Sequence, residues 1–354
     1  MNIPSAPITP PVVDISPLLA CRASGHSLSL NEQTTSTCEQ LLNAFQQIGF
    51  LYISEHGIPI DLQDELEGFA KQFFALPPAE KLKIRMEHAG RAWRGYFPVG
   101  AELTTNQPDQ KEGLYFGAEH DSNHPLVKAG EPMHGANLWP EGMGTQVPKL
   151  ITQYMDQMTA LGALLMSAIA VGLGLDERYF EQRFREPPTT LFRIFNYPRT
   201  DWIEHPHLWS VGEHTDMGLL TILKQDASGG LQVQSRSGQW LDVPYIADTF
   251  VINIGDMLEL WTWGLLRSTV HRVRNRSQQA RLSFPFFFDP SWNCSLERID
   301  RRLLPQVDQQ EACQTWGANQ RWDQMDLRQL TPNQTYGAFV WQKIRNVFPH
   351  LASR

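Results

Sequence analysis

Apolar positions in the first half of the chain follow the period of a helix. Apolar residues recur every three or four positions there, as expected for helices with one buried face. The helical pattern that begins near residue 56 stops at the Pro77–Pro78 pair, because proline cannot continue a helix. The pattern predicts helices over 38–49, 56–76 and 148–175, the first of which ends at Gly49.

Shorter runs in the same half predict strands and loops. "VVDIS" (12–16) and "FLYIS" (50–54) are rich in residues that favour strands. Residues 90–140 are rich in Gly, Pro and polar side chains, and they predict a long loop region of the kind that usually carries function.

The pattern changes near residue 189. Short β-branched or aromatic runs follow one another, separated by turn sequences such as "SGG", "RSG" and "NRS". Many short strands with regular turns are typical of a sandwich or barrel. We therefore expect a mainly β protein with flanking helices. A helical and loop region (1–188) would pack on a β core (189–300), and a segment (301–354) ending in a helix would follow.

Composition narrows the class of partner. The 354 residues carry a formal charge of −8, which argues against a general nucleic-acid binder. It does not exclude an anionic small-molecule substrate, and a small molecule is the partner that we expect. The four cysteines form no CxxC pair, so a reducing, cytoplasmic setting is expected. We expect no signal peptide, because the N-terminus has no basic region followed by a long apolar stretch. We expect no membrane association, because no run approaches eighteen apolar residues. A monomer or small homo-oligomer is expected.

The stretch "GEHTDMGLL" contains the first candidate site. His214 and Asp216 are two positions apart, which places them on one face if the strand extends through both. His271, in "STVHRV", supplies a third ligand at the end of another predicted strand. Two histidines and one carboxylate, with open positions opposite, are typical of non-haem Fe(II) oxygenases. A structural zinc site would need a fourth protein ligand.

A second pair follows ten residues after His271. Arg281 and Ser283, in "RLS", are again two apart on a predicted strand. A guanidinium binds a carboxylate through two parallel hydrogen bonds, and a hydroxyl can add a third. Tyr197, in "FNYP", offers another hydroxyl. These residues would anchor a carboxylate-bearing co-substrate near the metal.

The order H-x-D, H, R-x-S resembles the isopenicillin N synthase-like branch of the Fe(II)/2-oxoglutarate-dependent dioxygenases. "FQQIGFLYISEHGIP", "FFALPPAEK" and "TFVINIGDMLELWTWG" also resemble segments of that family, so the likeness covers nearly the whole chain. It implies a double-stranded β-helix (jelly-roll) core and an oxidoreductase that uses Fe(II), 2-oxoglutarate and O₂.

The resemblance also implies roles for the candidate residues. It makes His214, Asp216 and His271 the iron ligands and catalytic residues. It assigns binding of 2-oxoglutarate to Arg281 and Ser283, with Tyr197 beside them, and points Arg193 toward the co-substrate or a substrate acid.

The loop 93–117 is the part of the sequence that gives information about the substrate. Its G-Y-x-x-x-G-x-E-x-T pattern resembles a subgroup that includes arginine-using ethylene-forming enzymes. That resemblance implies that Glu102 and Thr104 hold a substrate guanidinium. Met217 stands where the subgroup often has a substrate-contacting tyrosine. Two further arginines are candidate contacts for a substrate carboxylate, Arg94 and Arg345.

These observations favour a hydroxylase of a small polar metabolite, for which arginine and homoarginine are candidates. Two alternatives stay open at this point. One is an isopenicillin N synthase-type oxidase that uses O₂ without 2-oxoglutarate. The other is a non-catalytic ligand-binding module on the same fold.

Overall fold

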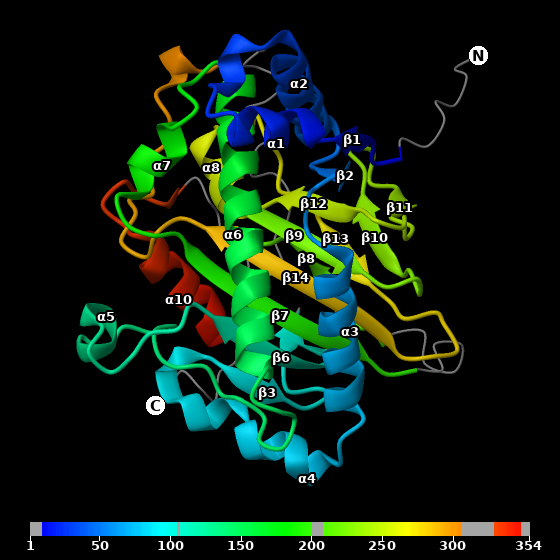
Figure 1. Ribbon diagram of the computed structural model, residues 1–354. Coiled ribbons are helices and arrows are strands. Elements are labelled where there is room, and N and C mark those ends of the chain that lie inside the picture. Colours follow the sequence, from blue (N-terminus) through cyan, green and yellow to red (C-terminus); the bar gives the residue numbers. More distant parts are fainter. Residues whose placement is uncertain (1–8, 105–106, 200–207, 306–328, 348–354) are drawn as a thin grey trace.

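A computed structural model describes residues 9–104, 107–199, 208–305 and 329–347 (Figure 1). It shows a mainly β protein with flanking helices and a jelly-roll core, which confirms the predicted fold class. The strands are β1 (Val12–Asp14), β2 (Phe50–Ser54), β3 (Gly95–Phe97), β4 (Leu103–Thr104), β5 (Gln107–Pro108), β6 (Glu112–Gly117), β7 (Thr189–Tyr197), β8 (Val211–His214), β9 (Leu220–Gln225), β10 (Leu231–Gln234), β11 (Trp240–Asp242), β12 (Phe250–Ile254), β13 (His271–Val273) and β14 (Arg281–Asp289).

The longer predicted helices are present. α2 starts after Asn31, whose side chain accepts a hydrogen bond from the Gln33 N–H and so caps the helix. It ends just before Gly49, which has a φ of 77°. The α-helices are α1 (Ser16–Ala23), α2 (Glu32–Gln47), α3 (Ile60–Phe74), α4 (Pro78–Lys81), α5 (Pro125–Lys128), α6 (Val147–Gly172), α7 (Tyr179–Phe184), α8 (Asp256–Trp261) and α10 (Tyr336–Val347).

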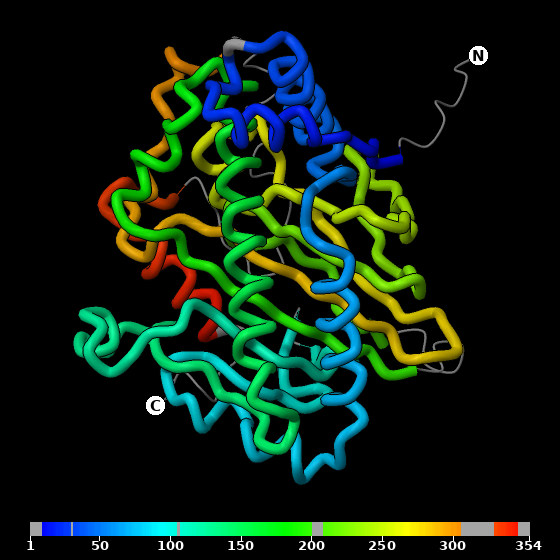
Figure 2. Tube along the Cα trace, in the orientation of Figure 1, coloured from blue at the N-terminus to red at the C-terminus, as the bar shows by residue number. Residues whose placement is uncertain are grey.

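The largest sheet joins both halves of the sequence. Its strand order is β1-β2-β12-β9-β14-β7-β6-β3, and a second sheet has the order β11-β10-β13-β8. Four strands of the larger sheet, β1, β2, β3 and β6, come from residues 1–188. The boundary near residue 188 therefore separates two sequence patterns but does not separate two sheets. Figure 2 shows the N-terminal helices in blue at one end of α6 and α10 in red beside the larger sheet.

Residues 90–140 are more ordered than the predicted loop region. β6 pairs with β7 and β3 pairs with β6, so this segment extends the larger sheet at one edge. Every residue of β6 is buried, although two glycines and a glutamate lower its strand propensity. Sheet pairing and burial outweigh that local preference.

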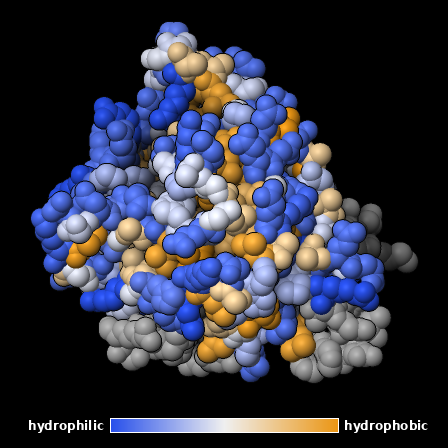
Figure 3. Space-filling view, turned by 60° about the horizontal axis from the view of Figure 1, so that its bottom comes forward, coloured by the Kyte–Doolittle hydropathy of each residue, from blue (hydrophilic) through white to orange (hydrophobic). Residues whose placement is uncertain are grey.

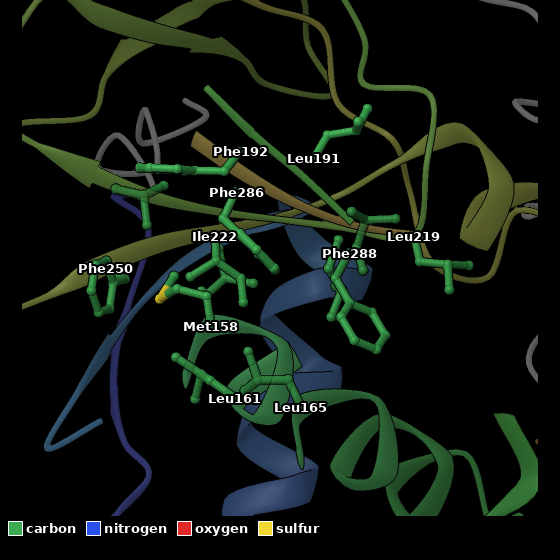
Figure 4. Packing of buried hydrophobic residues seen from close by; sticks show 14 of the residues in the cluster. Met158, Leu161, Leu165, Leu191, Phe192, Leu219, Ile222, Phe250, Phe286 and Phe288 are labelled. Carbon is green, nitrogen blue, oxygen red and sulfur yellow. The ribbon is translucent and has the colours of Figure 1, made fainter. Parts of the chain in front are cut away.

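The core lies between α6 and the larger sheet (Figure 4). Met158, Leu161 and Leu165 of α6 face the sheet there. On β14 the even-numbered residues Phe284, Phe286 and Phe288 are all buried at 1% exposure or less. Phe286 stands level with Phe192 of β7 and Ile222 of β9 in the sheet register, so these side chains form one apolar row beneath α6.

α6 is long and apolar enough to cross a membrane by length and composition alone. In this fold it packs on the sheet, and 56% of its most apolar stretch is buried inside the protein. Its apolar character is therefore explained by its place in the core. The face shown in Figure 3 is mainly hydrophilic, with hydrophobic patches between polar side chains.

Candidate active site

The predicted metal ligands lie together in a cavity between the two sheets. His214 is the last residue of β8, Asp216 follows in the turn before β9, and His271 begins β13. β8 and β13 pair with His214 opposite His271, which brings two distant segments together. Asp216 Oδ1 lies 3.9 Å from His214 Nε2 and 3.8 Å from His271 Nε2. One metal ion can therefore contact all three side chains.

The second ring nitrogen of each histidine is fixed by the backbone. His214 Nδ1 lies 2.8 Å from the Gly212 carbonyl oxygen, and His271 Nδ1 lies 3.0 Å from that of Thr269. A carbonyl only accepts, so each neutral ring donates from Nδ1 and keeps its Nε2 lone pair for a metal. Burial and the nearby His271 lower the pKa of His214 to about 3, which favours this neutral form.

Asp216 is oriented by its other oxygen. Oδ2 accepts hydrogen bonds from Thr221 Oγ1 at 2.5 Å and Asn253 Nδ2 at 2.7 Å, which leaves Oδ1 toward the histidines. Burial raises the pKa of this carboxyl, but the two histidines and the two hydrogen bonds outweigh burial and lower it overall. Two neutral imidazoles and a carboxylate, each with a free ligand atom, fit Fe(II) with open positions.

A carboxylate site lies beside the triad, on β14 and β7. Arg281 Nε donates to the Gly229 carbonyl at 2.6 Å, whereas Nη1 is buried without a hydrogen-bond partner among the described residues. The hydroxyl oxygens of Ser283 and Tyr197 lie 3.1 Å apart. A buried guanidinium N–H that lacks a partner, next to two hydroxyls, fits the carboxylate of 2-oxoglutarate.

The alternation of β14 explains how one strand builds both core and site. The side chains on its two faces alternate, so the even-numbered residues pack beneath α6. The odd-numbered residues all line the cavity: Arg281, Ser283, Pro285, Phe287 and Asp289. The aromatic run "FPFFFDP" is therefore divided, because Phe287 lines the cavity while its two neighbours, Phe286 and Phe288, belong to the core.

Comparison with known proteins gives the family. A model described as the 2OG-Fe(II) oxygenase superfamily matches residues 189–290. A second model, described as non-haem dioxygenase in morphine synthesis N-terminal, matches residues 10–142. A "probable iron/ascorbate oxidoreductase" of Dictyostelium discoideum is 43% identical over 337 residues, covering 88% of this chain and 89% of the relative. This chain belongs to the 2OG-Fe(II) oxygenase superfamily.

Other similar proteins differ in what their names state. A homoarginine-6-hydroxylase of Glycine max is 34% identical over 297 residues, covering 82% of this oxygenase and 88% of the relative. A 1-aminocyclopropane-1-carboxylate oxidase of Dictyostelium mucoroides is 33% identical over 374 residues, covering 96% of this chain and 95% of the relative. The crystal structure of a full-length Neurospora crassa protein in complex with alpha-KG superposes with a TM-score of 0.76 at 27% identity, covering 97% and 98%.

These findings confirm the predicted enzyme class and cofactors. The protein is a 2-oxoglutarate-dependent non-haem iron oxidoreductase that uses Fe(II), 2-oxoglutarate and O₂. The different names of its relatives leave the substrate to be argued from the cavity.

The cavity continues from the triad to a second group of predicted residues. Glu102, Thr104, Arg193 and Met217 all line it. The guanidinium of Arg193 lies 4.3 to 5.0 Å from the centroids of three aromatic rings, those of Trp93, Tyr115 and Phe287. Its Nε is buried without a hydrogen-bond partner among the described residues. Its Nη1 lies 3.9 Å from Glu102 Oε1, so Arg193 is a buried cation that is surrounded by ring faces and already has one acid beside it.

Glu102 and Thr104 already have partners within the protein. Lys111 Nζ lies 2.8 Å from Glu102 Oε2 and 2.6 Å from Asp109 Oδ2. Tyr115 donates its hydroxyl to Glu102 Oε1 at 2.8 Å, and Thr104 donates to Asp109 at 2.7 Å. A substrate guanidinium at Glu102 would therefore join an existing ion pair.

The two further arginines do not line the cavity, so the structure does not support their predicted contacts with a substrate. Arg94 is buried near β3, where Nη1 and Nη2 donate to the carbonyls of Ala92 and Met133. Arg345 is exposed on the last turn of α10. Neither lines the cavity. Sequence position alone could not give the direction in which these long side chains point.

Sequence reasoning missed several cavity residues. Lys111 lines the cavity from the segment before β6, Asp289 ends β14, and Tyr336 begins α10. Asp289 could have been found by extending the alternation Arg281–Ser283 along the same strand. Tyr336 carries no such signal, because only tertiary packing brings α10 to the cavity.

Proposed function

We propose that this oxygenase hydroxylates a small amino acid with a guanidino group, with homoarginine and arginine as the first candidates. The observation that carries the proposal is the buried Glu102 carboxylate in the wall of the cavity that holds the iron ligands. A carboxylate is a natural partner for a planar cationic fork. Homoarginine-6-hydroxylases of Glycine max and Oryza sativa are 34% and 35% identical to this chain, which supports the same substrate class.

The charges around the substrate end of the cavity also support a zwitterion. Apart from the iron ligands and Arg281, the charged lining residues are two acids and two bases, namely Glu102, Asp289, Lys111 and Arg193. Buried charges are stable only when each meets a partner. A small substrate with charges of both signs suits this wall better than a bulky apolar one.

The chain's own groups would position the reactants. His214, Asp216 and His271 would hold Fe(II), and Arg281 with Ser283 would orient 2-oxoglutarate. When bound, Fe(II) and 2-oxoglutarate supply oxidative decarboxylation, which gives succinate and CO₂ and activates O₂ for hydroxylation. Phe287, Leu191 and Val211 on the cavity wall would limit the entry of water.

The first test is succinate formation by the Fe(II)-loaded protein with 2-oxoglutarate under air. The panel comprises homoarginine, arginine, lysine, 1-aminocyclopropane-1-carboxylate and thymine, with Asp216→Ala as the inactive control. We expect succinate to rise several-fold with a guanidino amino acid, together with a product heavier by one oxygen atom. Succinate that rises only with another compound would contradict the guanidino assignment and keep the enzyme class.

Glu102→Gln tests the role of the carboxylate. The variant keeps the side-chain volume and should lower kcat/KM for the guanidino substrate by about 10- to 100-fold, the usual effect of losing a charge-assisted contact. Glu297→Gln, at an exposed position, is the matched control. An equal loss for guanidino and non-guanidino substrates would show that Glu102 only supports the local fold through Lys111.

A second candidate substrate is an uncharged planar ring, as in the Neurospora crassa structure bound to alpha-KG and thymine, which is 28% identical and covers 89% of this chain. The observation that favours it is the existing pairing of Glu102 with Lys111, which leaves that part of the wall near neutrality. Thymine in the panel separates this candidate from the first.

A further inference from the structure

Asp289 is a buried acid in the cavity wall to which neither the family resemblance nor the predicted site gives a role. It ends β14 and is 4% exposed. Its Oδ1 accepts the Leu219 N–H at 3.2 Å, and its Oδ2 accepts the Tyr336 hydroxyl at 2.5 Å. Oδ1 also fills the space where a Cβ on Gly218 would lie, so it stands directly over the turn that follows Asp216.

Asp289 differs from other buried acids of this protein in its charge balance. Glu102 and Asp109 share Lys111, Glu112 pairs with Lys81, and Asp256 pairs with Lys343. Asp289 has no cation within 4 Å among the described residues, and its two donors are both uncharged. Burial accordingly raises its pKa to about 7, since the charged form lacks a compensating cation.

The surroundings of Asp289 belong to the substrate end of the cavity. Phe287, two residues earlier on the same strand face, contacts the guanidinium of Arg193. Arg193 is also close enough to lower the pKa of Asp289. Asp289 and Arg193 offer a carboxylate and a guanidinium to the same cavity, and an α-amino acid carries the complementary ammonium and carboxylate groups on one carbon atom.

We propose that Asp289 receives the α-ammonium group of the substrate while Arg193 receives its α-carboxylate. This proposal rests on the proposed function in requiring an amino acid substrate, but it does not require a guanidino group. Each Asp289 oxygen keeps a lone pair beyond its present hydrogen bond, so an ammonium can bind without displacing Leu219 or Tyr336. Asp289 is thereby a specificity-determining residue that selects amino acids over the corresponding des-amino acids.

The test compares arginine with 5-guanidinopentanoate, which lacks only the α-amino group. In the wild-type holoenzyme we expect kcat/KM for hydroxylation to be about 10- to 100-fold higher for arginine. In Asp289→Asn that preference should fall to within about threefold, because arginine is turned over more slowly while 5-guanidinopentanoate is unaffected. Asn keeps an acceptor for the Leu219 N–H and removes the charge.

Two control variants separate recognition from support of the turn. Tyr336→Phe removes a hydrogen bond to Asp289 but keeps its charge, so it should keep the preference for arginine. Asp64→Asn, at an exposed position of α3, should leave both substrates unchanged. An equal loss for both compounds in Asp289→Asn would overturn the proposal and show that Asp289 only positions the turn after Asp216.

The wild-type comparison decides the matter even if Asp289→Asn does not fold. Equal kcat/KM for arginine and 5-guanidinopentanoate would overturn the proposal without any variant. If the succinate panel identifies an amino acid without a guanidino group, the proposed function fails. The present proposal is then tested with that amino acid and its des-amino analogue in place of arginine and 5-guanidinopentanoate. If it identifies only thymine, both inferences are overturned.

Discussion

At the scale of single residues, the site contains buried polar atoms that have no hydrogen-bond partner among the described residues or that are free to bind a metal. The Arg281 Nη1 lacks a partner among the described residues, and the free Nε2 and Oδ1 atoms of the triad face one another. Desolvated polar groups are costly when unpaired, so such atoms persist where a ligand compensates them. The fit to 2-oxoglutarate therefore depends first on Arg281.

Arg281→Gln should raise the 2-oxoglutarate concentration for half-maximal succinate formation by about 100-fold. The reason is the loss of a buried charge-assisted contact, which costs roughly 2–5 kcal/mol. The effect should appear mainly in the KM for 2-oxoglutarate, measured with saturating Fe(II) and substrate. Arg22→Gln, exposed on α1, is the matched control, and an unchanged KM in Arg281→Gln would refute the assignment.

At the scale of elements, α6 and the larger sheet fit so closely that one helix position tolerates no side chain. A Cβ on Gly162 would lie 2.4 Å from the ring of Phe288, which is 1% exposed. A Cβ on Gly68 of α3 would meet no atom within 4 Å. The two glycines lie within helices, so the same substitution should have opposite effects at the two positions.

Gly68→Ala should stabilise the protein by about 0.5–1 kcal/mol, because alanine loses less backbone entropy in a helix. Gly162→Ala should destabilise it by about 1–3 kcal/mol, because overpacking against Phe288 outweighs that gain. Urea unfolding of both variants measures the two changes in the free energy of unfolding. A stabilised Gly162→Ala would mean that the core beneath α6 can shift at little cost.

At the scale of the whole molecule, the N-terminal region and the β core form one unit. β1 and β2 extend the larger sheet, and His56, just after β2, packs on Phe250 of β12 with ring centroids 4.3 Å apart. Burial lowers the pKa of His56 to about 4, despite an opposing effect of Asp248. Protonation of His56 would therefore weaken this contact between the N-terminal region and the β core, so the stability of the contact depends on pH.

The free energy of unfolding should fall as pH drops from 6.5 toward 4. In that window the unfolded chain binds a proton at His56 that the folded chain excludes, so lowering the pH favours unfolding. Between pH 7 and pH 4.5, His56→Gln should remove about 1–2 kcal/mol of this fall. His26→Gln, at an exposed position, is the control. Parallel pH profiles of His56→Gln and the wild type would contradict the prediction.

The parts of this protein that could be predicted from sequence alone are those that repeat a local period or a short motif. The 3.6-residue period marked α2, α3 and α6, and the alternation Arg281–Ser283 placed two cavity residues on one strand face. H-x-D with the later histidine marked the metal ligands, because the chemistry requires those residue types. These features depend on neighbouring positions, which can be read directly along the chain.

The folded chain was needed to show which distant residues share the cavity and where long side chains point. Lys111 pairs with Glu102, and Tyr336 reaches Asp289 across 47 positions. Arg94 points instead into the loop beside β3. These outcomes depend on sheet order, on the docking of α10 and on the pairing of buried charges. They are properties of the packed interior, where each charge takes the partner that the fold brings within reach.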